Sequence, residues 1–222
     1  MKPLSLAKQV DTYIENVFIE EDASLKFAIK NSKKNNLPPI QITPVMGKFL
    51  YLQAKMTHAK TILEIGTLGG YSTLWFAHAV PLDGKIITIE HNQEYAEVAN
   101  ENIKNAGKEN IVELLIGDAK EILKKLKPSF DLIFIDANKE EYPEYMRLSK
   151  KLVHPGSIII CDNLIRNGGV LQEKPEKEYY KILNEFNKQL AADESMETTI
   201  LPLTIPLTGR DYVDGLSISI VK

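Results

Sequence analysis

The sequence predicts an α/β protein built on a single doubly wound, mostly parallel sheet. Short apolar runs alternate with longer segments that carry apolar residues at helical spacing. The first run, residues 62–65, breaks into a turn that contains Gly66, Gly69 and Gly70 and opens onto an apolar segment over 73–80. A strand, a glycine turn and a helix in this order are typical of the first unit of a nucleotide-binding sheet. A small-molecule cofactor on this turn is therefore the first hypothesis.

Length and composition indicate one globular domain. The chain has 222 residues, 44% hydrophobic and 26% charged, so we expect a single domain over 1–222. The net charge of -3 comes from interspersed Lys and Glu, which argues against a nucleic-acid partner. No apolar run approaches the ~20 residues that span a bilayer, and the first ten residues lack a signal-peptide pattern. The single Cys161 excludes an intrachain disulfide and is expected in the core. Together with the missing export signal and spanning run, it leads us to expect a cytoplasmic protein with no membrane partner.

Residues 1–57 are expected to form extra N-terminal helices that cover the cofactor, ahead of an α/β core over 61–222. The apolar face of the first helix consists of Leu6, Val10, Tyr13, Ile14, Val17 and Phe18. A weaker helical pattern follows, and the polar run over 31–36 is expected to be solvated surface. Pro44 fits the first turn of a third helix, because proline has no N–H and none is needed there.

Five short, β-branched runs are expected to form parallel strands covered by helices on both faces. These runs are residues 62–65, 86–89, 111–116, 132–135 and 158–160. The helices after the glycine turn are expected over residues 93–106, 119–127, 141–152 and 178–192. The last two apolar runs, 198–203 and 216–221, are joined by too few residues for a helical crossover. They should therefore pair antiparallel.

An acidic residue closes the second predicted strand. Glu90 stands where nucleotide-binding folds place a carboxylate that accepts hydrogen bonds from ribose hydroxyls. Nicotinamide dehydrogenases and methyltransferases that use S-adenosylmethionine (SAM) share that position. The spacing of Gly66, Gly69 and Gly70 differs from G-x-G-x-x-G and offers no second N–H cluster for a pyrophosphate, which favours SAM. Asp118 ends the third strand, where it can accept from the adenine amine or cap the next helix.

Oxygen ligands follow the next two predicted strands. Asp136 ends one strand, and Asp162 and Asn163 end the other, so all three are expected at one edge of the sheet. Two carboxylates and an amide oxygen suit a hard divalent ion such as Mg²⁺. The alternative is that these residues only cap the following turns. Lys139 is a candidate general base beside such an ion, and without the ion it is a surface lysine.

Five motifs in order resemble those of the cation-dependent O-methyltransferases, which include catechol and caffeoyl-CoA O-methyltransferases. They lie at residues 62–72, 89–90, 117–119, 131–139 and 162–163, and the resemblance covers nearly the whole chain. It implies an enzyme that transfers a methyl group from SAM to a catechol-like or phenolic small molecule. It also implies a divalent cation, Mg²⁺ first, with Ca²⁺ or Mn²⁺ as alternatives. The resemblance to this family and the amphipathic N-terminal helices together imply a homodimer.

The resemblance implies a role for each matching residue. The implied SAM site consists of Ile42, Thr43, Glu64, Gly66, Tyr71, Ser72, Glu90, His91, Asp118, Ala119 and Asp136. The implied cation ligands are Asp136, Asp162 and Asn163, and the implied catalytic residues are Asp136 and Lys139. Two positions depart from the family pattern: many relatives have Asp where this chain has Asn138, and some have an acid or Gln near Met46. Neither departure removes a cation ligand.

Substrate choice is expected to lie in two loops above the strand ends. These loops are residues 164–177, with Arg166, and residues 204–214, with Arg210 and Tyr212. Two alternatives from other classes remain. A nicotinamide-dependent oxidoreductase would use the same Glu90, and a non-catalytic SAM-fold interaction protein would bind SAM without methyl transfer.

Overall fold

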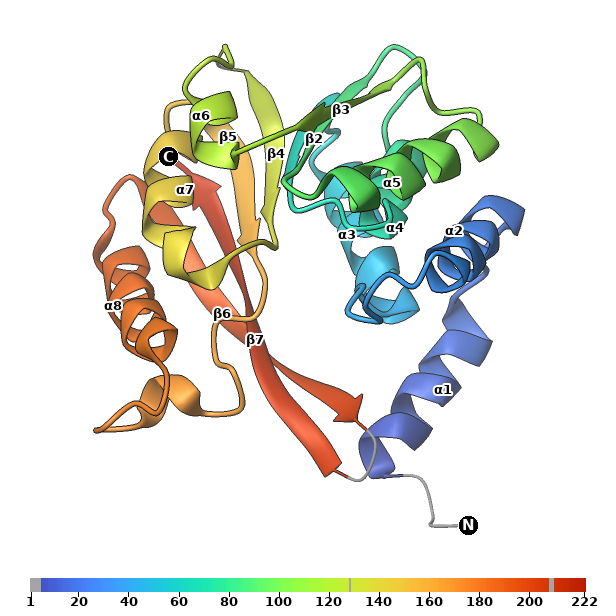
Figure 1. Cartoon of the computed structure of the whole chain (residues 1–222). Helices are drawn as coiled ribbons and strands as arrows, with labels where there is room; N and C mark the ends of the chain where they lie inside the picture. Colours follow the sequence, from blue (N-terminus) through green and yellow to red (C-terminus); the bar gives the residue numbers. More distant parts are fainter. Residues whose placement is uncertain (1–4, 128, 208–209) are drawn as a thin grey trace.

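The computed structural model describes residues 5–127, 129–207 and 210–222, and within them a seven-stranded sheet is covered by helices on both faces (Figure 1). The strands are β1 Thr61–Ile65, β2 Lys85–Glu90, β3 Val112–Ile116, β4 Phe130–Ile135, β5 Val153–Cys161, β6 Met196–Leu207 and β7 Arg210–Val221. The α-helices are α1 Leu6–Phe18, α2 Ala23–Lys34, α3 Pro44–Met56, α4 Tyr71–Ala79, α5 Gln93–Asn105, α6 Ala119–Leu123, α7 Tyr142–Ser149 and α8 Glu178–Ala192. The 3₁₀ helices are η1 Lys139–Glu141 and η2 Gly169–Leu171.

The strand order across the sheet is β3-β2-β1-β4-β5-β7-β6. Adjacent strands from β3 to β5 are parallel, whereas β7 runs antiparallel to both β5 and β6. The winding direction reverses between β1 and β4, the place where folds of this kind bind their ligands. The predicted fold class is therefore confirmed: a doubly wound, mostly parallel α/β sheet with an antiparallel C-terminal strand and preceding helices.

Alternate side chains of the parallel strands enter two separate cores. On one face of the sheet, Leu63 and Ile133 pack with α6, α7 and α8, and on the other, Ile62 and Leu132 pack with α3, α4 and α5. Because helices cover both faces, all four of these side chains are fully buried, and the strands read as continuous apolar runs. Cys161 is buried in the first core, as predicted.

The C-terminal hairpin is longer than the sequence indicates. Pairing of β6 with β7 runs without interruption from Met196 opposite Val221 to Leu207 opposite Arg210. The prediction of a loop over 204–214 is therefore wrong, while the part of this segment in substrate choice stays a prediction. The side chain of Arg210 lies outside the described residues. The prolines of this segment are compatible with a strand because β6 is the edge of the sheet, where alternate N–H groups point away from the only neighbouring strand.

Polar side chains fix the starts of the helices near the sheet edge. Thr43 Oγ1 accepts from Met46 N at 3.2 Å ahead of α3, and Pro44 occupies the first turn of that helix as predicted. Asp118 Oδ1 accepts from Lys120 N at 2.7 Å and from Glu121 N at 3.3 Å ahead of α6. Each oxygen satisfies N–H groups that have no partner within the first turn of the helix.

Helix α1 carries the predicted apolar face, but that face is not covered. No residue of α1 is buried, and Leu6, Tyr13 and Phe18 have exposed fractions of 73%, 63% and 66%. The helix touches α3 and β6 at its edge and projects toward the free end of the β6–β7 hairpin (Figure 1). Across the described ranges, no helix combines the length and the apolar character that a bilayer crossing requires.

Candidate active site

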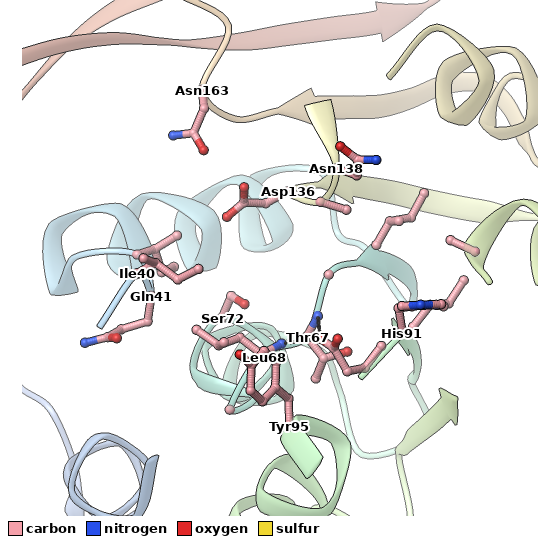
Figure 2. Close-up of a pocket in the computed structure, with 18 of the residues that line it drawn as sticks. Ile40, Gln41, Thr67, Leu68, Ser72, His91, Tyr95, Asp136, Asn138 and Asn163 are labelled. Carbon is pink, nitrogen blue, oxygen red and sulfur yellow. Dashed lines mark hydrogen bonds between the residues drawn. The ribbon is translucent and has the colours of Figure 1, made fainter. Parts of the chain in front are cut away.

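A cavity of about 540 Å³ opens at the carboxyl ends of the parallel strands (Figure 2). Its walls come from the glycine turn after β1, from the ends of β2 to β5, and from the segment that precedes α3. Its size lies within the roughly 300–1,000 Å³ typical of small-molecule sites. Figure 2 shows Asp136, Asn138 and Asn163 along one side of this cavity and Thr67 and Leu68 across from them. The cavity therefore lies where the strand-end rule places a ligand.

The glycine turn is pressed against the end of β4. Gly66 adopts φ +99°, and a Cβ at this position would lie 2.1 Å from the carbonyl oxygen of Asp136. Asp136 N in turn donates to Ile65 O at 2.9 Å. At Gly69, a Cβ would come within 2.1 Å of Ser32 Oγ in α2. Close backbone approach, which only glycine permits, thus joins the turn to the strand end that carries Asp136.

Glu90 holds the glycine turn in place. Its Oε2 accepts from Thr67 N at 3.2 Å and from Leu68 N at 2.8 Å, and its Oε1 accepts from Asn92 N at 2.9 Å. Leu68 is in the left-handed region with φ 50°, a conformation that these bonds help to maintain. Glu90 is nearly buried yet lines the cavity, so its remaining lone pairs face the space that a ligand would fill.

Most of the residues expected to hold SAM line this one cavity. They are Ile42, Gly66, Tyr71, Ser72, Glu90, His91, Asp118, Ala119 and Asp136. Thr43 and Glu64 do not line it: Thr43 caps α3, and Glu64 is fully buried behind Ser72. The roles assigned to these residues remain predictions, and for Glu64 the geometry favours an indirect role.

Glu64 binds three hydroxyl groups inside the core. Its carboxylate accepts from Ser72 Oγ and Thr73 Oγ1 at 2.5 Å and from Thr88 Oγ1 at 2.7 Å. Burial raises the pKa of Glu64 to about 7, although the three hydroxyl donors act in the opposite direction. The Glu64 carboxylate therefore orients Ser72. Of these two residues, only Ser72 lines the cavity.

Tyr71 directs its hydroxyl away from the cavity. Tyr71 OH donates to Glu21 Oε1 at 2.6 Å, and its ring stands edge-on to Trp75. Burial, together with the hydrogen bond to Glu21, raises the pKa of Tyr71 well above its usual value. The hydroxyl therefore remains a neutral donor that ties the start of α4 to the segment between α1 and α2.

The predicted cation ligands are brought together at the ends of β4 and β5. Asp136 and Asn163 line the cavity, while Asp162 is 6% exposed and its Oδ1 accepts from Asn163 N at 2.7 Å. Burial raises the pKa of Asp162, and the negative charge of Asp136 raises it further. In the described part of the chain, no three His, Cys, Asp or Glu side chains form a possible metal cluster. A cation at this edge would therefore depend on the amide oxygen of Asn163.

Lys139 is held inside this group and is not a surface lysine. Its Nζ donates to Asp136 Oδ1 and to Tyr142 OH, both at 2.7 Å, and its side chain is 12% exposed. Tyr142 is fully buried and donates to the carbonyl oxygen of Asp162 at 2.9 Å. Asn138 Oδ1 accepts from Glu140 N at 3.4 Å ahead of η1, so this departure from the family pattern serves as a cap.

A buried pair of asparagines links α2 to the glycine turn. Asn102 in α5 is fully buried and donates to Gly69 O at 2.8 Å, while its Oδ1 accepts from Asn31 Nδ2 at 2.9 Å. The prediction that residues 31–36 are solvated surface is thus wrong for Asn31, which is 6% exposed. The sequence does contain a signal for this buried link, which the prediction did not use. Asn102 lies between Ala99 and Ile103, within the apolar stripe of α5.

Replacing Asn102 with alanine is expected to lower the free energy of unfolding by about 2 kcal/mol, because the Gly69 carbonyl and the Asn31 amide would both lose a buried partner. Urea denaturation of the variant measures this change. Asn105→Ala, at an exposed position of the same helix, is the matched control and should change stability by less than about 0.5 kcal/mol. Equal stability of the two variants would refute the proposed link.

Comparisons with known proteins cover nearly the whole chain. A family model described as O-methyltransferase matches residues 15–209. Catechol O-methyltransferase from Niastella koreensis is 39% identical over 219 residues, which are 97% of each chain. Catechol O-methyltransferase from Mycobacterium tuberculosis is 34% identical over 214 residues, covering 96% of this chain and 95% of that protein.

Solved structures show the same fold at similar identity. The O-methyltransferase from Bacillus cereus, solved in complex with SAH, is 35% identical with a TM-score of 0.90 over 96% of this chain and 97% of its own. The O-methyltransferase TomG from Streptomyces achromogenes, solved in complex with SAM, is 31% identical with a TM-score of 0.90. That match covers 99% of this chain and 100% of the other.

Proposed function

Because this chain belongs to the O-methyltransferase family, we propose that it transfers a methyl group from SAM to one hydroxyl of a catechol-like small molecule, with a divalent cation at the sheet edge. One observation carries the proposal. The glycine turn, Asp136 at the end of β4, Asn163 after β5, and Lys139 all line a single cavity. Family membership also decides between the methyltransferase and dehydrogenase hypotheses that Glu90 left open.

SAM would lie along the glycine turn. Gly66 and Ser72 would contact its amino acid end, with Glu64 orienting the Ser72 hydroxyl from behind. Glu90 would accept from the ribose hydroxyls, because its carboxylate faces the cavity and is already oriented by backbone amides. The adenine would lie between His91 and the Asp118 end of the cavity, where Tyr95 adds an aromatic side chain that sequence reasoning had not singled out.

The donor set at the sheet edge suits a divalent cation. Asp136 and Asp162 are two carboxylates close enough for the charge of one to raise the pKa of the other, with a single lysine beside them. Asn163 adds a neutral oxygen, and oxygen-only ligands favour Mg²⁺. When bound, such an ion would lower the pKa of an acceptor hydroxyl and orient two vicinal oxygens.

Lys139 would take the proton of the accepting hydroxyl. The neutral amine is the form that accepts a proton, so the Lys139 ammonium that pairs with Asp136 would first release its proton to solvent. The acceptor oxygen then forms a bond to the methyl carbon as the carbon–sulfur bond of SAM breaks, and SAH leaves. Tyr142, whose pKa burial raises far above its usual value, stays neutral and positions Lys139 Nζ. Alignment of two bound reactants supplies most of the rate enhancement.

The proposal is tested by offering methyl-labelled SAM with catechol, with resorcinol and with phenol. We expect a monomethyl ether from catechol and at least tenfold slower transfer to the other two, because only vicinal hydroxyls can share one cation. Equal rates with all three would refute a catechol-like acceptor. SAM binding with no transfer to any diol would also contradict the proposed acceptor.

We also propose a homodimer in which the apolar face of α1 packs against a second copy. That face exposes Tyr13, Val17 and Phe18, and a helix without any buried residue gains little stability from its own chain. Sedimentation equilibrium should give twice the monomer mass for the wild type and the monomer mass for Tyr13→Glu/Phe18→Glu. A monomeric wild type, or a dimeric variant, would contradict this interface. Glu15→Gln, on the same helix, is the control.

A further inference from the structure

The cavity contains a second cationic side chain that the proposed reaction does not use. Arg166 follows Asn163 on the loop after β5, and both residues line the cavity. Lys139 is paired with Asp136, so its charge is already compensated. The loop thus places Arg166 three residues after Asn163, an expected cation ligand, at the end of the cavity where the acceptor is proposed to bind.

The backbone at Arg166 is fixed in an unfavourable conformation. Arg166 and Asn167 have φ values of 51° and 55°, in the left-handed region that costs a non-glycine residue about 1 kcal/mol or more. Three contacts with β7 maintain it. Arg166 N donates to Asp214 Oδ1 at 2.9 Å, Asn167 N donates to Val213 O at 2.6 Å, and Val213 N donates to Asn167 Oδ1 at 3.3 Å. The direction in which Arg166 leaves the chain is therefore set by the fold.

The guanidinium is held by its ion pair with Asp214 and by a side-chain hydrogen bond with Tyr179, but it is not fully paired. Its Cζ lies 5.8 Å from the centroid of the Tyr179 ring and 5.9 Å from that of Tyr212. Its NH1 is 3.6 Å from Asp214 Oδ2, beyond the ~2.7–3.2 Å of an N–H···O hydrogen bond. The buried Nε has no hydrogen-bond partner among the described residues. The side chain remains 28% exposed and lines the cavity.

Asp214 is the ion-pair partner of Arg166, but its hydrogen bonds go to the loop backbone. Its Oδ1 accepts from three backbone amides, those of Ile165, Arg166 and Gly215, each at 2.9 Å. These amides stabilise the buried carboxylate and orient it toward the backbone of the loop. Asp214 thus anchors the loop, and the guanidinium keeps donors available for a planar, bidentate anion.

We propose that Arg166 is a specificity-determining residue that selects acceptors carrying a carboxylate on the ring, away from the reacting hydroxyls. This inference rests on the proposed function. A carboxylate matches the fork of a guanidinium, which here lies near the rings of Tyr179 and Tyr212. An acceptor with its diol beside Asn163 and its carboxylate on Arg166 would be held at both ends.

The test compares 3,4-dihydroxybenzoate with the neutral 3,4-dihydroxybenzyl alcohol. For the wild type, we expect a KM for the benzoate about tenfold below that for the alcohol, the factor expected from one charge-assisted contact. Arg166→Gln should raise the benzoate KM by about tenfold or more, with kcat nearly unchanged and the alcohol KM unaffected. Arg166→Lys should give an intermediate benzoate KM. Arg147→Gln, which removes an exposed arginine of α7, is the control and should match the wild type.

Two outcomes would overturn the assignment. One is equal KM values for the two acceptors in the wild type, and the other is an equal loss for both in Arg166→Gln, as expected if Arg166 only supports the loop. Calorimetric titration of 3,4-dihydroxybenzoate into the SAH-loaded protein gives a readout that does not depend on turnover. If the wild type methylates neither acceptor, the proposed function fails. In that case, weaker binding of 3,4-dihydroxybenzoate to Arg166→Gln still supports a carboxylate contact by Arg166. Unchanged binding of 3,4-dihydroxybenzoate refutes that contact.

Discussion

Gly66→Ala is expected to abolish SAM binding and methyl transfer, with the largest loss of stability of any substitution considered for this protein. The new Cβ would lie 2.1 Å from the carbonyl oxygen of Asp136 and 2.9 Å from its carbon, both of them backbone atoms. The turn and the end of β4 would have to separate, and a φ of +99° would strain alanine in addition. We expect a loss of about 3 kcal/mol or more in unfolding free energy.

Gly156→Ala separates the steric effect from the backbone effect. Gly156 has φ +89°, close to the value at Gly66, but a Cβ there would meet nothing within 4 Å. The Gly156→Ala variant should therefore lose only about 1–2 kcal/mol of unfolding free energy, the conformational cost alone, and should retain SAM binding. Calorimetric titration with SAM and urea denaturation measure both quantities. If Gly66→Ala binds SAM as the wild type does, the close contact between the turn and β4 has no role in the cofactor site.

Asp136→Ala is expected to lower kcat by about 10³-fold, or ~4 kcal/mol, while the protein stays folded. The substitution removes a proposed cation ligand and also the ion-pair partner of Lys139, 2.7 Å from its Nζ. Because Asp162 is buried near Asp136 and has a raised pKa, removing Asp136 also relieves repulsion between the two carboxylates. Stability should therefore fall little, and activity should fall far more.

The control for this variant is Asp83→Ala. Asp83 is an exposed aspartate that pairs with Lys60 at 3.2 Å, far from the cavity, and its removal should leave kcat unchanged. Single-turnover rates at saturating SAM give the comparison. Activity of Asp136→Ala above one-tenth of the wild-type rate would show that this carboxylate is not needed for the chemistry.

The sheet could be predicted because its signal is local and strong. Strands buried on both faces read as short β-branched runs, and each helix between them carried its own apolar spacing, so the order of elements followed directly. The hairpin of β6 and β7 was underestimated because Pro206 and the polar residues after it resemble a loop. The pairing of Pro206 with Asp211 becomes visible only when β6 is known to be an edge strand.

The candidate site could be predicted as far as strand ends determine it. Glu90, Asp136 and Asn163 share a cavity because parallel strands end at one edge of the sheet. The sequence does not show which side of a turn a residue faces. Glu64 and Ser72 were assigned together, yet only Ser72 lines the cavity.

Tertiary contacts account for what the sequence analysis missed. The buried asparagine link depends on α2 packing against α5, and Asn31 and Asn102 are 71 residues apart in the chain. The guanidinium of Arg166 lies between tyrosines from α8 and β7. Local spacing carries no information about such contacts, which form only when distant elements pack together.

The central claim is that a divalent cation held by Asp136, Asp162 and Asn163 is required for methyl transfer. The most direct measurement is the rate of catechol methylation by protein stripped with EDTA, before and after addition of Mg²⁺. We predict that stripping lowers the rate to background while SAM binding persists, and that Mg²⁺ restores it in the wild type but not in Asp162→Ala. Full activity in the presence of excess EDTA would contradict the claim.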